Sequence, residues 1–68
     1  MTKEEFKRKF ENQHGEGTLV IMRSMYHKTY LPKIVISRAC GLSYRQTKYW
    51  LNLGEKAGYF VRNSVDNL

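Results

Sequence analysis

Apolar residues recur at three- and four-residue spacing in the second quarter of the chain, which is typical of a helix with one buried side. Thr18 can cap the start of this helix, and we expect the helix to end near His27. The pattern therefore predicts a helix that packs one side against the rest of a small helical domain. The recurring positions are Leu19, Ile21, Met22, Met25 and Tyr26.

Another helix is predicted near the start of the sequence, over about residues 3–13. Thr2 followed three residues later by Glu5 is typical of a capping box, in which each side chain accepts a hydrogen bond from the other residue's backbone N–H. Phe6 and Phe10 stand one turn apart and form only a narrow apolar stripe. We therefore expect this helix to dock weakly on the rest of the protein, or to dock on a partner.

Two short helices separated by a glycine-led turn are predicted in the middle of the chain. Pro32 favours the first turn of a helix, which we expect to run to about Cys40. Gly41 ends it, and Ser43 with Gln46 three residues later repeats the capping-box signal for the next helix. This order of elements is that of a helix-turn-helix.

The residues around this turn suit their positions in a helix-turn-helix. Ser37 is small where the two helix axes approach, Gly41 can adopt the positive φ of the turn, and Leu42 is an apolar plug beneath it. Thr47 keeps a β-branched shape, but its hydroxyl needs a partner, for which we expect a backbone carbonyl one turn earlier. The remaining core positions are Ile36, Cys40 and Trp50.

The last helix is predicted to reach about Lys56, because Gly58 supplies the left-handed stop that is common at helix ends. Residues 59–62, Tyr-Phe-Val-Arg, favour a short strand, and Asn63-Ser64 can turn the chain after it. Only a stub of a returning strand fits in the residues that follow. A wing of two strands is therefore expected to be vestigial.

The segment ISRACGLSYRQTKYWLNLGEKAGYFVR, from Ile36 to Arg62, resembles without a gap the winged helix-turn-helix of bacterial and phage transcription regulators. The FaeA-like fimbrial regulators are a near likeness, since their recognition helix also ends in an EKAG-type sequence before a strand. The resemblance implies a winged-helix fold and binding of duplex DNA. Gly54 departs from it, because these families place a leucine there, and we expect the helix to fray, kink or shorten beyond Leu53.

Together these features predict a single, mostly α-helical domain over residues 1–68. We expect a trihelical helix-turn-helix core over about residues 18–57, winged-helix-like with a vestigial wing, and the additional N-terminal helix in front of it. A chain of 68 residues has room for a small core of this kind and little more. Its size favours a phage, virus or plasmid setting.

Charge adds a functional direction to this fold. Twelve Lys and Arg against six Asp and Glu give a net charge of +6, which attracts polyanions. No carboxylate occurs between Glu16 and Glu55. A solvated basic face is the plain alternative to a nucleic-acid-binding surface, and the position of the charges on the helices distinguishes the two. The basic residues in this interval are Arg23, Lys28, Lys33, Arg38, Arg45 and Lys48.

The helix that begins after Ser43 is predicted to bury one side and to expose an acid-free side. Arginine and lysine can pair with guanine in the major groove and asparagine with adenine, while tyrosine can contact phosphate or a thymine methyl group. We therefore expect segment 43–53 to be the recognition helix of a protein that binds double-stranded DNA sequence-specifically. The outer candidates are Tyr44, Arg45, Lys48, Tyr49 and Asn52, and the phosphate candidates are Ser43, Lys33 and Arg38.

Other functional classes find little support in the residues. Cys40 is the single cysteine, and with only His14 and His27 it gives neither a disulfide nor a zinc-finger spacing. Catalytic constellations and phosphate-cradling glycine loops are missing, so we expect no enzyme and no cofactor. The apolar runs are far shorter than the roughly 20 residues that cross a bilayer. We expect a cytoplasmic protein without a membrane partner.

Two alternative functions remain open at this point. A protein-interaction module would keep the helical scaffold and bind a partner through Phe6, Phe10, Tyr59 and Phe60. An RNA or single-strand binder would stack bases on Tyr30, Tyr44 and Tyr49. The acid-free face favours DNA, and because one helix makes few base contacts, we expect a homodimer or cooperative binding on paired half-sites.

Overall fold

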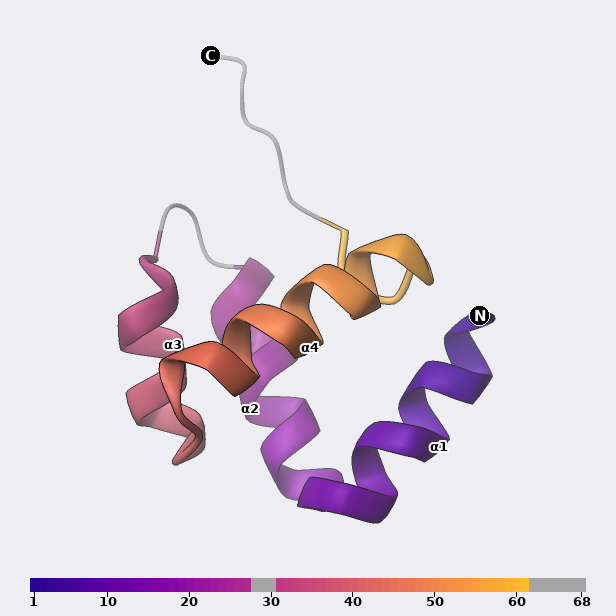
Figure 1. The fold of residues 1–68 in the computed structure, drawn as a ribbon, viewed down its shortest axis with the longest axis horizontal. Coiled ribbons are helices and arrows are strands. Elements are labelled where there is room, and N and C mark those ends of the chain that lie inside the picture. The colour runs from indigo at the N-terminus through magenta and orange to yellow at the C-terminus, as the bar shows by residue number, and fades with distance from the viewer. Residues whose placement is uncertain (28–30, 62–68) are drawn as a thin grey trace, which may run out of the picture.

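The protein is described by a computed structural model that covers residues 1–27 and 31–61. Within these ranges the chain forms four helices and no strand, so the predicted mostly α-helical class is confirmed (Figure 1). Tyr30, Lys28 and the segment from Arg62 onward, with its predicted turn, lie outside the described residues. The helices are α1 (Lys3–His14), α2 (Glu16–His27), α3 (Lys33–Cys40) and α4 (Tyr44–Lys56).

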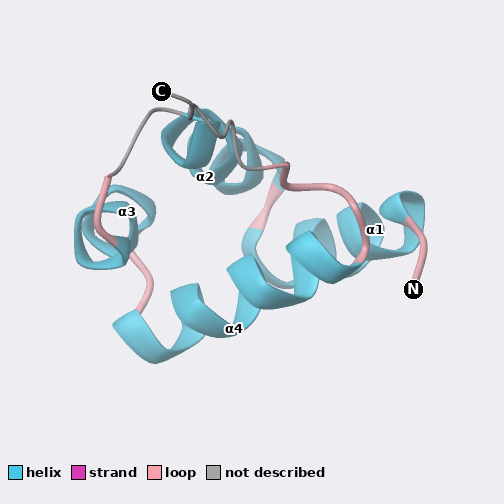
Figure 2. Cartoon of the chain, turned by 90° about the horizontal axis from the view of Figure 1, so that it is seen from above, coloured by secondary structure: helices cyan, strands magenta, loops and turns pink. Residues whose placement is uncertain are grey.

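The helices follow one another around a common core. Each helix packs on the next in the chain, and α1 also packs on α4, which closes the ring. In Figure 2 the arrangement is seen from above, with α2 and α4 on opposite sides and α3 and α1 between them. Consequently, the outer sides of α2 and α4 point in different directions.

Helix α1 is part of the core rather than an appendage. The capping box predicted from Thr2 and Glu5 is present, and the hydrogen bond from the Thr2 backbone lowers the pKa of the Glu5 carboxyl. Phe6 and Phe10 are fully buried. Their ring centroids lie 5.9 and 4.9 Å from that of Trp50 on α4. The expectation of weak docking, or of docking on a partner, was therefore wrong for this pair of side chains.

Helix α2 begins earlier than the sequence predicted. Thr18 does not cap it, because the helix already starts at Glu16, directly after Gly15, which adopts a φ of 92° and separates α1 from α2. Leu19, Met22 and Tyr26 are buried and Met25 is partly buried, as their spacing predicted. Ile21 was wrongly placed with them, since it falls on the far side of the stripe and is 42% exposed.

The glycine-led turn between α3 and α4 has the predicted geometry. Gly41 adopts a left-handed conformation with a φ of 71°. Its N–H donates to the carbonyl of Arg38 at 3.3 Å, and the N–H of Leu42 donates to the carbonyl of Ser37 at 3.0 Å. These two bonds are those of a Schellman motif, which satisfies the last carbonyls of a helix. Ser37 is buried, and its hydroxyl donates to the carbonyl of Ile34 at 2.8 Å.

Helix α4 starts directly after Ser43, and its axis is turned away from that of α3. The hydroxyl of Ser43 accepts a hydrogen bond from the N–H of Gln46 at 3.1 Å, so Ser43 is the N-cap, as predicted. The reciprocal bond from the Ser43 N–H to the Gln46 side chain, which a full capping box requires, is not formed. In Figure 2 α3 is seen nearly end-on while α4 runs across the picture, so the two axes cross at a large angle. A large crossing angle across a short turn is the geometry of a helix-turn-helix.

The end of α4 differs from the predicted strand. Gly58 has a φ of 79°, as expected of a left-handed stop, and the N–H groups of Tyr59 and Phe60 both donate to the carbonyl of Gly54, at 2.8 and 3.2 Å. These bonds fold the chain back, so that residues 59–61 are a bend and a loop, not a strand. The strand prediction was wrong because the Phe60 side chain is buried in the core instead of pairing along an edge.

Gly54 makes this burial possible. The helix continues through Gly54 to Lys56, so the expected fraying or shortening beyond Leu53 was also wrong. A Cβ added at Gly54 would overlap the Phe60 ring and lie 3.0 Å from Cζ of Phe6. The missing side chain is therefore the notch into which Phe60 packs.

The polar groups of Thr47 and Cys40 lie in or against the apolar core. The hydroxyl of Thr47 is buried without a hydrogen-bond partner among the described residues, so the expected bond to a backbone carbonyl one turn earlier is not formed. Cys40 is partly buried against the core, and this burial raises the pKa of its thiol. Cys40 thus occupies the core position that the sequence predicted.

Candidate nucleic-acid interface

The outer side of α4 presents the side chains that the sequence singled out. All five outer candidates are exposed, with Tyr44 at 48% and Tyr49 at 51%. The inner side is buried and carries Thr47, Trp50, Leu51 and Gly54, as predicted. We call the exposed set, Tyr44, Arg45, Lys48, Tyr49 and Asn52, the outer face of α4.

The outer face extends one turn further than the sequence analysis recognised. Asn52 and Lys56 are four residues apart and so lie on the same side of the helix. With Tyr49 and Leu53 they line a shallow hollow in the surface. The i to i+4 spacing from Asn52 was the available signal for Lys56. Glu55, also exposed, ends the acid-free part of the helix at its last turn.

Tyr49 is anchored although it is exposed. Its ring centroid lies 5.2 Å from that of Trp50 at an interplanar angle of 77°, which is an edge-to-face contact. Trp50 is itself buried in the core. An exposed aromatic side chain that is held by a contact with the core can bind a ligand with little loss of conformational freedom.

Trp50 is positioned by a hydrogen bond that the sequence did not indicate. Its indole N–H donates to Nε2 of His14 at 3.1 Å, across 36 residues of sequence. To accept this bond the imidazole must be neutral with its proton on Nδ1. His14 lies at the end of α1, so the bond joins α1 to the middle of α4 and holds the outer face in its orientation.

The start of α4 carries no acidic residue in its first turn. The Ser43 hydroxyl is exposed but already accepts the Gln46 N–H as the N-cap. The remaining first-turn N–H groups, those of Tyr44 and Arg45, have no carbonyl partner inside the helix by its geometry. This end of the helix can therefore offer backbone donors and the Ser43 O–H to an anion.

The two candidates on α3 differ in their position. Arg38 is exposed and lies in the last turn of α3. Its backbone carbonyl accepts a hydrogen bond from the N–H of Gly41, in the turn that leads to α4. Lys33 is half-buried in the first turn, at the other end of the helix. Arg38 therefore lies beside the turn that leads into α4, whereas Lys33 lies at the far end of α3.

Comparison with known proteins adds no identification. Protein-family models, curated proteins and solved structures were all searched, and none matches this chain. Among the described residues, no helix is both long enough and apolar enough to cross a membrane. In the same part of the chain, no three residues of the His, Cys, Asp and Glu types come together as ligands for a metal ion.

Proposed function

We propose that this protein binds double-stranded DNA sequence-specifically, with α4 in the major groove, and acts as a small cytoplasmic transcription regulator. The observation that carries the proposal is the outer face of α4, where five exposed polar, basic and aromatic residues stand on a helix whose inner side is fixed in the core. A B-DNA major groove is wide enough to admit an α-helix. The resemblance to winged helix-turn-helix regulators points to the same binding mode.

The side chains of the outer face suit the chemistry of base edges and phosphates. Arg45 and Lys48 can donate to O6 and N7 of guanine, and Asn52 can bond the N6 and N7 edge of adenine. Tyr44 and Tyr49 can reach phosphates or thymine methyl groups. We propose that three residues outside this face contact DNA phosphates: Ser43, Lys33 and Arg38. Such contacts set the register of the helix on the DNA without reading its sequence.

One α4 helix reads only a few base pairs. Two copies on half-sites about one helical turn of DNA apart would double the number of contacts. We therefore include a homodimer, or cooperative binding of two copies, in the proposal. The operator would then be a pseudo-palindrome.

Single-strand binding is the second candidate function, because Tyr44 and Tyr49 expose about half of their surface on one helix. Bases can stack on such rings without sequence preference. The protein-interaction alternative is less well supported, since three of its four residues, Phe6, Phe10 and Phe60, are buried in the core. Those side chains cannot contact a partner while the domain is folded.

A salt titration of binding to labelled random duplex DNA tests the proposal. If about four to six Lys and Arg side chains displace condensed counterions, the logarithm of the affinity falls against the logarithm of salt with a slope of about −0.9 per neutralised phosphate. The single-stranded form of the same oligonucleotide is the matched control. A flat salt response on duplex DNA, or tighter binding to the single strand, would contradict the proposal.

A further inference from the structure

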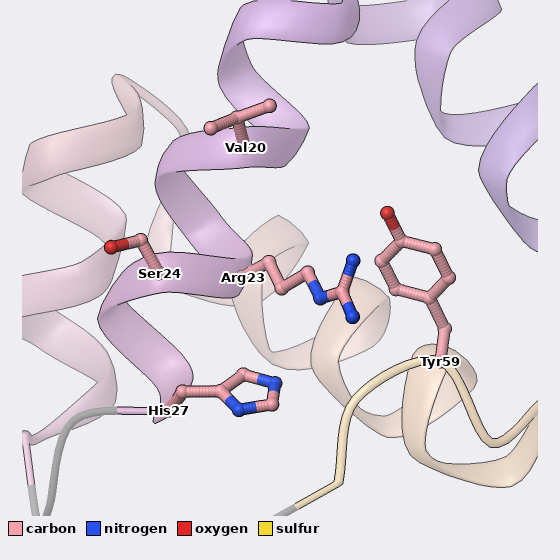
Figure 3. Close-up of a pocket in the computed structure, with 5 residues that line it drawn as sticks. All are labelled: Val20, Arg23, Ser24, His27 and Tyr59. Carbon is pink, nitrogen blue, oxygen red and sulfur yellow. The ribbon is translucent and has the colours of Figure 1, made fainter.

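A second surface feature lies between α2, the start of α1 and the segment that follows α4. Two adjoining hollows share three lining residues, Arg23, His27 and Tyr59. Figure 3 shows Arg23 and His27 extending from α2 toward the side of Tyr59, which comes from the segment after α4. We call the two hollows together the α2 groove. Its other lining residues are Val20, Ser24, Lys3, Glu4, Lys7, Gly58 and Val61.

The wall of the α2 groove is fixed to the core. The Tyr59 ring centroid lies 5.3 Å from those of Phe6 and Phe60, both of which are buried. The guanidinium carbon of Arg23 lies 5.1 Å from the Tyr59 ring centroid, within the range of a cation–π contact. Arg23 is therefore held over a rigid ring, with its donors available at the mouth of the groove.

The lining combines positive charge with apolar surface. Lys3, Lys7 and Arg23 are cationic, and Glu4 is the one carboxylate among the described residues that line the groove. Val20 lines one of the two hollows and Val61 the other, and both side chains are exposed. A ligand that matches this lining needs anionic groups for the cations and apolar groups for the valines and the tyrosine ring.

We propose that the α2 groove docks an acidic segment of a partner protein, one in which Asp or Glu side chains alternate with apolar ones. Charge complementarity supports this occupant, because carboxylates pair with the groove's excess of cations. Duplex DNA fits less well, since its backbone presents mainly phosphates and small sugars, with no extended apolar side group for Val20 and Val61. This inference does not depend on DNA binding at α4.

The test is a selection of displayed random dodecapeptides on the immobilised full-length protein, followed by affinity measurements on the synthetic winners. We expect the winners to be enriched in Asp, Glu and apolar residues. Arg23→Ala should weaken their binding by about fivefold or more, as expected of a central arginine in an interface. Arg8→Ala is the matched control, because Arg8 is an exposed arginine of α1 that lines neither hollow, and it should leave the affinity within about twofold.

Several results would overturn the inference. They are the recovery of no peptide, winners without acidic enrichment, or equal effects of Arg23→Ala and Arg8→Ala. Circular dichroism of both variants shows that a loss of binding is not a loss of fold. If Arg23→Ala weakens duplex DNA binding more than peptide binding, the groove is a nucleic-acid surface instead. Failure of the salt titration at α4 would leave these outcomes unchanged, so the two proposals are tested separately.

Discussion

The two sides of α4 carry out different tasks with the same backbone. The inner side holds Trp50 and Leu51 in the core, with Gly54 beneath the Phe60 ring. The outer side carries Arg45 and four other exposed residues, of which Tyr49 also contacts the core through the Trp50 ring. The comparison shows that packing decides where this helix lies, whereas its outer composition is free to be selected for a ligand.

This division predicts separate effects of substitution. Changes on the inner side should alter the free energy of unfolding, because they remove or overlap buried atoms. Changes at Arg45, Lys48 and the other outer residues apart from Tyr49, whose ring contacts Trp50, should alter it by no more than about 0.5 kcal/mol, as is usual for surface positions.

Trp50→Ala should have the largest effect on stability. It removes a buried indole that contacts Phe6 and Phe10 and donates to His14. Truncation of a buried aromatic costs on the order of 3–5 kcal/mol, which is a large share of the stability of a small domain. Chemical denaturation followed by circular dichroism measures the loss. Unchanged stability would mean that Trp50 does not hold α1 and α4 together.

Gly54→Ala should destabilise the protein by about 1–3 kcal/mol, the usual cost of overpacking a core. The added methyl group would overlap the Phe60 ring, and this outweighs the better helix propensity of alanine. Gly17→Ala is the matched control, because a Cβ at Gly17 in α2 meets nothing within 4 Å. That control should be neutral or stabilising. If both glycines respond alike, Phe60 does not pack in the notch at Gly54.

Thr47→Val should stabilise the protein by about 1 kcal/mol. The substitution keeps the β-branched shape and replaces a buried hydroxyl that has no partner among the described residues. Thr18→Val on α2 serves as a control, since it makes the same chemical change at a residue that is only half-buried. A rise in melting temperature for Thr47→Val alone is the expected result. A clear loss of stability would show that the hydroxyl is paired.

The sequence predicted the helices well where the signals are local. Thr2 and Ser43 cap their helices by hydrogen bonds that span three residues, and Gly41 and Gly58 end theirs by a positive φ. Such signals do not depend on the rest of the fold. The outer face of α4 was predictable for the same reason, since helical periodicity alone separates its two sides.

The remainder depends on contacts between distant residues. A stripe of two phenylalanines does not specify its partner, so the burial of Phe6 and Phe10 against Trp50 became visible only in the fold. Tyr59 and Phe60 have strand propensity, but this preference is easily overridden by burial, and here the notch at Gly54 overrides it. The pair of Trp50 and His14 and the α2 groove also join residues far apart in sequence.

The difference between base reading and backbone contact sharpens the account of the outer face. Arg45 is exposed on α4, the helix that we propose to enter the DNA major groove, whereas Lys33 lies half-buried in the first turn of α3. Lys33→Ala should weaken binding to all duplexes alike and lower the salt slope by about one unit. Neither Lys33→Ala nor Arg45→Ala should change the melting temperature noticeably, since neither side chain belongs to the core.

The most direct test of the central claim is the affinity of Arg45→Ala for a duplex selected from a random pool by the unaltered protein, measured beside a scrambled duplex. We expect a loss of about 1–3 kcal/mol on the selected site, relaxed preference at one or two base pairs, and little change on the scrambled duplex. Equal losses on both duplexes would contradict base reading by α4 and would show that this helix contacts only the phosphate backbone.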